Sequence, residues 1–302
     1  MARASIDIGS NSLLLLVVDD DGAPVYDQVS VVGLGKGIGH RGMFAADRME
    51  AALAVLTEYG NTAESMGVPA DRIQAVATSA ARRAMNATSF FERVKAETRI
   101  TVEIISGIQE AQLTWSGALI GLPIPSGAVA VVDLGGGSTE IVIGNPQTDA
   151  DTQQRSLELG SVRLTEKYFG SDVDRYHPSE LAKLRSAIVA EVETINWSIM
   201  PRALVAVAGT ATTLCAMELG LTEWDAKRVH GSRLGRAALR RWIDRLLDST
   251  KEERQTLAAI SPERADYLLA GACVLEAVCS SAHRDSIWIS DGGVRHGLLR
   301  TS

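Results

Sequence analysis

The chain has 302 residues, of which 46% are hydrophobic and 22% are charged. This length suits two domains of ordinary size, each able to bury its own core, and the composition is ordinary for a soluble globular protein. The formal net charge of −7 argues against a broad electrostatic grip on nucleic acid. We therefore expect no nucleic-acid partner, and an anionic substrate would need a local cluster of basic residues.

The cysteines and the apolar segments bear on where the protein works. Cys215, Cys273 and Cys279 show no CxxC spacing and lie in apolar, helix-like sequence, so we expect reduced core residues. The apolar run 13–18 is too short for a signal peptide, and the segment 267–279 is too short to span a bilayer. The sequence therefore predicts a cytoplasmic protein without a membrane partner.

The first part of the chain predicts an antiparallel meander followed by alternating helices and strands. A turn with three aspartates and a glycine separates two of its strands, and a loop rich in glycine follows the third. Apolar residues at three- and four-residue steps predict the first long helix. In chain order the elements are strands 4–8, 13–18 and 25–32, helix 45–66, strand 73–78, helix 88–98, strand 101–105 and helix 108–120.

The second part repeats this order after segment 121–127, whose glycines and prolines indicate a domain boundary. We expect one domain at 1–125 and another at 126–292. The later elements are strands 128–133, 140–144, 155–159, 203–208 and 286–290, with helices at 162–169, 179–199, after 213, at 236–247, 251–258 and 262–281, and a short last one. Strand–strand–strand–helix–strand–helix, present twice, indicates an α/β protein of two duplicated domains with mixed sheets and an interdomain cleft.

The two meanders begin with variations on one motif. Residues 5–18 and 131–143 each contain an apolar strand, then Asp-x-Gly, then small hydroxyl or amide residues, then a second apolar run. Asp7 and Asp133 end the first strand of each copy. One Asp-x-Gly alone would be a hairpin turn as readily as a site. Two copies with matching flanks favour a pair of loops that hold phosphate and a metal ion.

The residue types in these loops suit that chemistry. Carboxylates at Asp7 and Asp133 can hold Mg²⁺ directly or through water beside phosphate oxygens. Glycines let backbone N–H groups approach those oxygens, and hydroxyl or amide side chains add donors. The predicted phosphate-binding residues of the two loops are Gly9, Ser10, Asn11, Ser12, Gly135, Gly136, Gly137, Ser138 and Thr139. A Rossmann motif is disfavoured because a strand follows these glycines, and a Walker A motif is absent.

Three further positions are open to two readings each. Gly209 and Thr210 open a helix after a strand and could offer N–H groups to a phosphate, or they could form an ordinary N-terminal cap. Glu110 lies in a first helical turn, where it could deprotonate a water or only complement the helix dipole; the residues alone slightly favour the dipole. Arg82 follows a strand and could clamp a phosphate, or could be a solvated arginine.

Taken together, these segments resemble the exopolyphosphatase and guanosine pentaphosphate phosphohydrolase (Ppx/GppA) family, within the sugar kinase, Hsp70 and actin superfamily. The matching pieces follow the family order over nearly the whole chain. They are 7–12 (DIGSNS), 33–37 (GLGKG), 77–82 (ATSAAR), 106–111 (SGIQEA), 133–140 (DLGGGSTE), 208–212 (AGTAT), 229–231 (VHG), 264–266 (RAD) and 293–297 (GVRHG).

The resemblance implies two actin-like (ribonuclease H-like) domains, with the C-terminal helix 293–302 returning to the first. It implies Mg²⁺-dependent removal of a terminal phosphate from inorganic polyphosphate or from guanosine pentaphosphate. Glu110 would be the general base and Arg82 would grip the substrate. Asp133 and Glu140, together with Asp7, would hold the metal and its water network. A homodimer is also compatible with the resemblance.

Two alternatives to a hydrolase stay open at this point. One is a phosphotransferase or chaperone-like ATPase of the same superfamily, which the Glu110 helix and the Arg82 loop argue against. The other is a catalytically silent nucleotide sensor. Two residues also depart from the family pattern, because Gln109 and His296 stand where glutamates are common. The chain ends without the extra helical domains of longer members, which help to hold long polyphosphate.

Overall fold

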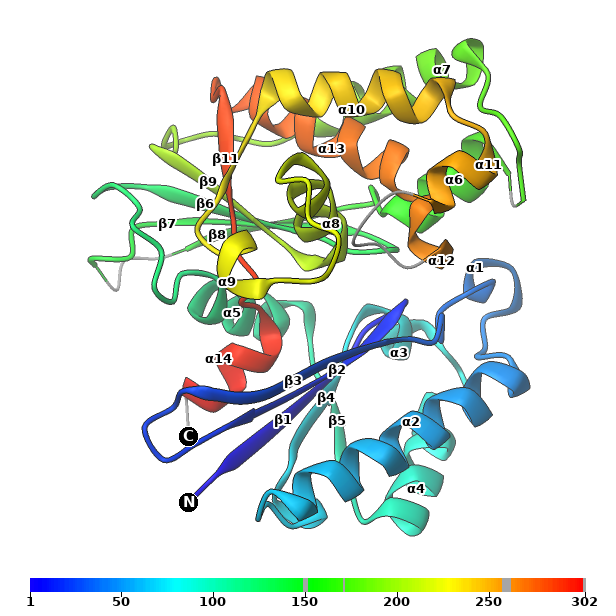
Figure 1. The fold of residues 1–302 in the computed structure, drawn as a ribbon, viewed down its shortest axis with the longest axis vertical. Coiled ribbons are helices and arrows are strands. Elements are labelled where there is room, and N and C mark those ends of the chain that lie inside the picture. Colours follow the sequence, from blue (N-terminus) through cyan, green and yellow to red (C-terminus); the bar gives the residue numbers. More distant parts are fainter. Residues whose placement is uncertain (149–151, 171, 257–261, 301–302) are drawn as a thin grey trace. The chain divides into compact units, whose positions relative to one another are not determined.

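The computed structural model describes residues 1–302 except 149–151, 171, 257–261 and 301–302. These residues form two compact units (Figure 1). Unit 1 comprises Met1–Gly117 and Val294–Ser302, and unit 2 comprises Ala118–Gly293. Within the described part of the chain, no helix combines the length and the apolar character that a membrane crossing needs.

Unit 1 is built on a five-stranded mixed sheet with the order β3-β2-β1-β4-β5. Strands β1, β2 and β3 pair antiparallel, which confirms the predicted meander, while β1, β4 and β5 pair parallel. The strands are β1 Arg3–Ile8, β2 Ser12–Val18, β3 Pro24–Val31, β4 Gln74–Ala77 and β5 Val102–Ile104.

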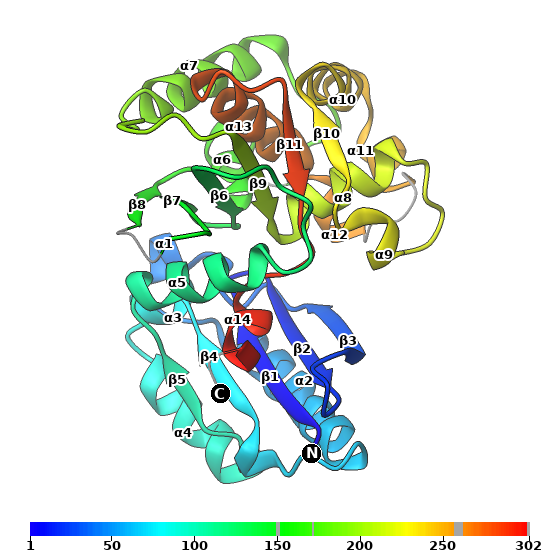
Figure 2. The ribbon, with the colours of Figure 1, turned by 90° about the vertical axis from the view of Figure 1, so that its left-hand side faces the viewer.

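Helices cover both faces of this sheet (Figure 2). The long helices α2 and α4 pack on the face that carries Ile6 and Ile8. Because side chains alternate along a strand, Ser5 and Asp7 lie on the opposite face, where the Ser5 hydroxyl donates to the Arg295 carbonyl of α14 at 2.7 Å. The helices of unit 1 are α1 Ile38–Arg41, α2 Ala46–Ser65, η1 Ala70–Arg72, α3 Ser79–Arg83, α4 Ala87–Thr98, α5 Gly107–Ala118 and α14 Val294–Arg300.

Unit 2 repeats this sheet and extends it by one strand. Its order is β10-β11-β9-β6-β7-β8. Strands β6, β7 and β8 form the antiparallel meander, and β6, β9 and β11 pair parallel, as β1, β4 and β5 do in unit 1. The strands are β6 Val129–Leu134, β7 Thr139–Gly144, β8 Gln153–Leu157, β9 Ala203–Val207, β10 Arg233–Gly235 and β11 Ser286–Ile289. The predicted α/β class, with two mixed sheets of related topology, is confirmed.

One apolar helix organises the core of unit 2. Helix α13 packs against α6, α7, α8 and α10, and its residues from Leu268 to Cys279 are buried without exception. The helices of unit 2 are α6 Ser161–Tyr168, α7 Pro178–Val192, α8 Ala208–Glu218, α9 Ala226–Val229, α10 Arg236–Asp248, α11 Lys251–Gln255, α12 Pro262–Ala265 and α13 Leu268–Ser281. The three cysteines are reduced and buried, as predicted.

Two predicted helices are shorter or broken in the structure. The helix expected at 179–199 ends at Val192, because the following residues leave the helix to place Trp197, whose indole N–H donates to Ser281 at 2.8 Å. The helix expected at 262–281 is divided into α12 and α13. The predicted segment 251–258 begins with α11, while its last two residues lie outside the described part. Short α1, α3, α9 and β10 were not predicted.

One histidine binds the two segments by which the chain enters and leaves unit 2. The Nε2 atom of His230 lies 3.0 Å from the Ile120 carbonyl, just after α5. The Asp291 N–H donates to its Nδ1 atom at 3.3 Å, just before α14. Since Nδ1 accepts, the ring proton belongs on Nε2, which donates to Ile120. A single imidazole therefore holds both ends of unit 2.

A glycine in α14 permits its close packing on α5 within unit 1. A Cβ atom at Gly297 would lie 2.1 Å from the Leu113 carbonyl oxygen. We expect Gly297→Ala to lower the stability of unit 1 by about 1–3 kcal/mol, because backbone would have to move. Gly293→Ala is the control, since a Cβ there meets nothing within 4 Å. Urea unfolding checks this, and equal midpoints for the two variants would contradict it.

Candidate active site

The two Asp-x-Gly hairpins have the same internal geometry. In unit 1 the Gly9 N–H donates to the Ser12 carbonyl at 3.0 Å, and in unit 2 the Gly135 N–H donates to the Ser138 carbonyl at 3.0 Å. Asp7 and Asp133 each stand two residues before that glycine, as the penultimate residue of β1 and of β6. The duplication read from the sequence is therefore a duplication of structure.

The unit 1 loop is supported from one side through its carbonyl groups. The Ser10 carbonyl accepts from Gly35 at 2.7 Å, and the Asn11 carbonyl accepts from Gly33 at 2.8 Å. Gly35 is closely packed, because a Cβ there would lie 3.1 Å from Ser10 and from Ala80, and these neighbours would have to shift. The glycine-rich segment after β3 thus supports the hairpin loop between β1 and β2 through backbone hydrogen bonds.

The unit 2 loop is supported in the same manner by the start of α6. The Gly135 carbonyl accepts from Ser161 at 3.0 Å, and the Gly136 carbonyl accepts from Val162 at 3.0 Å. A Cβ at Gly160 would lie 2.3 Å from the Gly136 oxygen, so only glycine fits there. The first N–H groups of α6, which no helical carbonyl can satisfy, are used to fix this loop.

The hydrogen bonds that the loop carbonyls accept fix the direction in which the loop N–H groups point. In a trans peptide the C=O of one residue and the N–H of the next point in opposite directions, and no cis peptide occurs among the described residues. The N–H groups of Asn11, Gly136 and Gly137 therefore point away from the supporting segments. Both loops present amide donors on one side, which is the arrangement that binds anions such as phosphate.

The start of α8 and the side chain of Arg264 add further hydrogen-bond donors in unit 2. Helix α8 follows β9 directly, and its first residue Ala208 has a φ of 69°. The Arg264 guanidinium lies against Gly209, where a Cβ would be 2.6 Å from Nη1, and Nη1 lies 3.5 Å from the Thr213 hydroxyl. Burial lowers the pKa of Arg264. The sequence flagged residue 264 within a motif but assigned it no role.

Two carboxylates of unit 2 stand side by side on neighbouring strands. Asp133 on β6 pairs directly with Glu140 on β7, so their Cβ atoms are about 5 Å apart on one face of the sheet. That face is opposite to the one on which Val132 and Leu134 join the core. Glu140 is buried and accepts from Ser156 at 3.0 Å. Two adjacent negative charges favour a cation between them.

In unit 1 the predicted base and the predicted arginine are bonded to each other. Glu110 lies in the first turn of α5, as predicted, and is 7% exposed. The Arg82 Nη1 atom donates to Glu110 Oε2 at 2.7 Å and to the Ile105 carbonyl at 3.0 Å. These contacts hold the Arg82 side chain, which belongs to α3, at the end of β5. Arg82 is an exposed residue, but its side chain is ion-paired, and Glu110 bonds it from the start of α5.

Asp7 is the most unusual carboxylate of unit 1. Its Oδ1 atom is buried and has no hydrogen-bond partner among the described residues. Burial, and next the charge of Glu110, raise its pKa to about 7, while the charge of Arg295 acts in the opposite direction. A buried carboxyl oxygen without a donor is costly when ionised, so this group is suited to bind a cation or a hydrated cation.

These donors fit a magnesium ion. No group of three or more His, Cys, Asp and Glu side chains with metal-binding spacing occurs in the part of the chain that the structure describes. Mg²⁺ does not need one, because it is usually held by one or two carboxylates and completes its shell with water and substrate phosphate. The pair Asp133 and Glu140 and the unpartnered oxygen of Asp7 offer such carboxylates.

A model of the Ppx/GppA phosphatase family matches residues 16–302. Exopolyphosphatase 2 of Mycobacterium tuberculosis is 33% identical, with 98% of this chain and 96% of the relative covered.

The chain belongs to the Ppx/GppA phosphatase family.

Solved structures of relatives agree with this assignment. The crystal structure of the Aquifex aeolicus member of the Ppx/GppA family has 33% identity and a TM-score of 0.82, and covers 100% of this chain and 97% of its own. An exopolyphosphatase from Cytophaga hutchinsonii has 27% identity and a TM-score of 0.88, with the same coverage. Similarity over the full length of both chains means that the whole fold is shared.

The family departure at Gln109 has a structural explanation. The Ser106 hydroxyl lies 3.2 Å from the Gln109 N–H, and the Gln109 Oε1 atom accepts from the Ser106 N–H at 2.9 Å. This is a capping box, in which glutamine and glutamate serve equally well. The substitution therefore preserves the start of α5, which carries Glu110.

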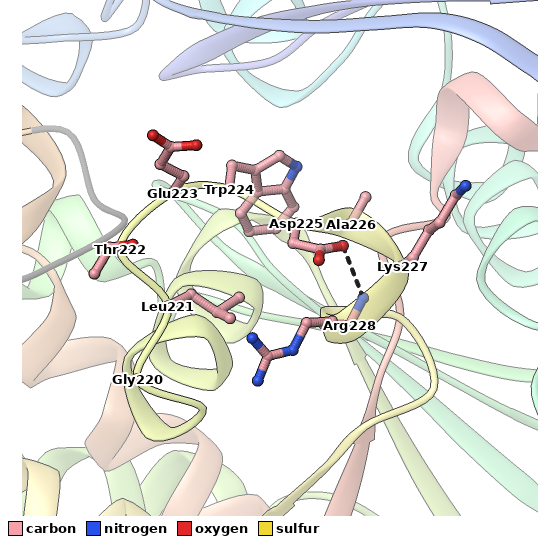
Figure 3. Close-up of a pocket in the computed structure, with 9 residues that line it drawn as sticks. All are labelled: Gly220, Leu221, Thr222, Glu223, Trp224, Asp225, Ala226, Lys227 and Arg228. Carbon is pink, nitrogen blue, oxygen red and sulfur yellow. Dashed lines mark hydrogen bonds between the residues drawn. The ribbon is translucent and has the colours of Figure 1, made fainter.

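A cavity of about 490 Å³ also occurs in unit 2, at the end of α8 (Figure 3). It is lined by residues 220–228, none of which the sequence had singled out. Asp225 accepts from the Arg228 N–H at 3.1 Å and so begins α9, and Trp224 is 49% exposed. No predicted site residue contributes to this cavity.

The raised pKa of Asp7 predicts a stability that depends on pH. The fold raises the pKa of Asp7 from an ordinary value of 3.8 to about 7, so the folded protein holds the proton more tightly. Stability is then greatest below pH 4 and falls as pH rises through 7. Without divalent ions, Asp7→Asn should stabilise the protein at pH 8 by up to about 4 kcal/mol, and by little at pH 4.

Urea unfolding of both proteins at several pH values measures this difference. Asp27→Asn is the comparison, because Asp27 accepts two bonds from Arg295, at 3.1 and 2.9 Å. Loss of that pair should destabilise the protein. If Asp7→Asn raised the free energy of unfolding equally at pH 4 and pH 8, the raised pKa of Asp7 would be contradicted.

Proposed function

We propose that this chain is an exopolyphosphatase that hydrolyses the terminal phosphoanhydride bond of inorganic polyphosphate and releases orthophosphate. Membership of the Ppx/GppA family and the likeness to Exopolyphosphatase 2 support the reaction class. The observation that carries the proposal is the bonded pair of Glu110 and Arg82, because it joins a carboxylate base to a phosphate-binding cation.

The loops of unit 2 would bind the phosphate chain. The N–H groups of Gly136 and Gly137 point away from α6, and the first turn of α8 adds Gly209 and Thr210. Arg264, which is half-buried and lies against Gly209, would supply positive charge to bind the negatively charged phosphate chain. Ser138 and Thr139 belong to the same hairpin. Phosphoryl transfer depends mainly on such positioning and charge neutralisation.

Unit 1 would contribute the proton acceptor. Glu110 would accept the proton of the attacking water at its carboxylate. Arg82, now bonded to Glu110 Oε2, would exchange part of that contact for a substrate phosphate oxygen, leaving the carboxylate able to take the proton. The hairpin residues Gly9, Ser10, Asn11 and Ser12 would add amide and hydroxyl donors.

In unit 2, Asp133 and Glu140 would hold the metal ion, and in unit 1 Asp7 is the proposed metal ligand. A bound Mg²⁺ would neutralise phosphate charge and orient the water and the substrate. Glu140 is held by Ser156, so its carboxylate would keep one orientation with or without the ion.

Glu110→Gln should lower kcat about 10²- to 10⁴-fold, because the amide cannot accept the proton. Phosphate release would be measured with Mg²⁺ from short polyphosphate, long polyphosphate and guanosine pentaphosphate in parallel. The control is Glu103→Gln, an exposed glutamate on β5, which should leave the rate unchanged. Phosphate release from guanosine pentaphosphate alone would mean that the nucleotide, and not polyphosphate, is the substrate. No phosphate release from any of the three would refute the proposed hydrolase activity.

Asp133→Asn should weaken the response to Mg²⁺ in a manner that does not depend on turnover. In the wild type a bound ion should raise the midpoint of thermal unfolding, because it binds only the folded state. The variant should lose most of this rise and, without the ion, gain up to about 1 kcal/mol from relief of the repulsion with Glu140. Differential scanning calorimetry measures both effects. If Mg²⁺ raised the unfolding midpoint of the variant as much as that of the wild type, Asp133 would be excluded as a metal ligand.

A further inference from the structure

An arginine of unit 2 is buried completely, although the proposed chemistry does not use it. Arg254 at the end of α11 is 0% exposed and is among the largest fully buried side chains of the protein. Its guanidinium carbon lies 4.1 Å from the centre of the Tyr176 ring. An arginine so deeply buried is costly unless every donor is used, and this raises the question of what it holds.

The donors of Arg254 bind three separate segments of the chain. Nη1 donates to the carbonyls of Asp174 at 3.1 Å and Ser249 at 2.9 Å, and Nη2 donates to that of Val173 at 2.8 Å. Nε and Nη2 both contact one carboxylate oxygen of Asp266, at 3.4 and 3.2 Å. The guanidinium therefore fixes Asp266, which lies between α12 and α13, to the segment that follows α6.

The backbone at Asp266 is held as firmly as its side chain. Its carbonyl accepts from the Tyr176 hydroxyl at 2.8 Å and lies 3.5 Å from the Thr165 hydroxyl of α6. These contacts explain why the chain does not continue as one helix from α12 into α13. The junction is bonded to α6 through Thr165 and to Arg254 through the carboxylate.

The elements that meet at this junction are those that support the phosphate loops of unit 2. Helix α6 binds the carbonyls of Gly135 and Gly136 through its first turn. Arg264, two residues before Asp266, lies against Gly209. On the other side of the junction, a Cβ at Gly271 of α13 would be 2.2 Å from a methyl carbon of Thr210. Arg254 thus binds the junction whose neighbouring elements support both the loop at 135–137 and the loop at 209–210.

We propose that Arg254 is a positioning residue for substrate binding, which holds the α12–α13 junction so that Arg264 and the loops at 135–137 and 209–210 keep their relative positions. This rests on the proposed function of those loops. Arg254 touches no substrate. Its loss would displace several phosphate donors together and weaken binding of the substrate, while Glu110 and Arg82 in unit 1 would be unaffected.

The test compares variants at this junction with a matched control in the same unit. Arg254→Met removes the donors and keeps the volume. Tyr176→Phe removes only the hydroxyl bond to the Asp266 carbonyl and spares the fold. The control is Glu276→Gln, which removes the negative charge of a buried carboxylate in the other half of α13 that Arg240 contacts at 2.9 and 2.8 Å. Circular dichroism establishes the temperature at which each variant is folded.

At that temperature KM and kcat for tripolyphosphate are measured. Arg254→Met should raise KM about tenfold and Tyr176→Phe about threefold, with kcat within about twofold, because the lost binding is shared by ground state and transition state. Glu276→Gln should leave KM unchanged. An unchanged KM in folded Arg254→Met would overturn the proposal, and so would an equal rise in Glu276→Gln. If Arg254→Met does not fold, Tyr176→Phe decides.

Failure of the proposed function would be recognised separately. It would appear as absence of turnover in the wild type with every phosphate substrate. In that case the dissociation constant of tripolyphosphate, measured by calorimetry on the same variants, would replace KM. An affinity reduced in Arg254→Met and Tyr176→Phe, and retained in Glu276→Gln, would support the positioning role. Equal affinities in all proteins, or no binding to the wild type, would overturn it.

Discussion

Everything proposed for this protein depends on which way a few peptide groups face. Two glycine hairpins give their carbonyl oxygens to supporting backbone, namely Gly33 and Gly35 in unit 1 and the first turn of α6 in unit 2. The planarity of the peptide bond then turns the following N–H groups outward. The donors need no charged side chain and lose no side-chain entropy on binding. This explains how a protein with a net charge of −7 can be built to receive a polyanion.

The same arrangement occurs twice, but the two copies have diverged in their partners. In unit 1 the hairpin accompanies the acid Asp7, whose buried oxygen has no hydrogen-bond partner among the described residues, and the bonded pair of Glu110 and Arg82. In unit 2 it accompanies two acids on adjacent strands and the half-buried Arg264. Under the proposed function, the copy in unit 1 would serve proton transfer and the copy in unit 2 would serve charge neutralisation.

The sequence predicted those features that local pattern determines. The two meanders, Asp7 and Asp133 at strand ends, and Glu110 in a first helical turn all follow from alternation, glycine position and helix periodicity. It could not predict the contact of Arg264 with Gly209, because the two are brought together only by the packing of α13. The break at Asp266 was missed for a similar reason. The apolar period continues through it, and only hydroxyl donors distant in sequence interrupt the helix.

The two bonds of His230 have a consequence for how such a chain can arise and be taken apart. Because one imidazole reaches both Ile120 and Asp291, unit 2 begins and ends at the same spot on its own surface. It has the form of an insertion with adjacent ends, placed within the sequence of unit 1. Neighbouring ends make domain insertion and circular permutation tolerable. A second copy can therefore be accommodated inside the first without disturbing the sheet of either.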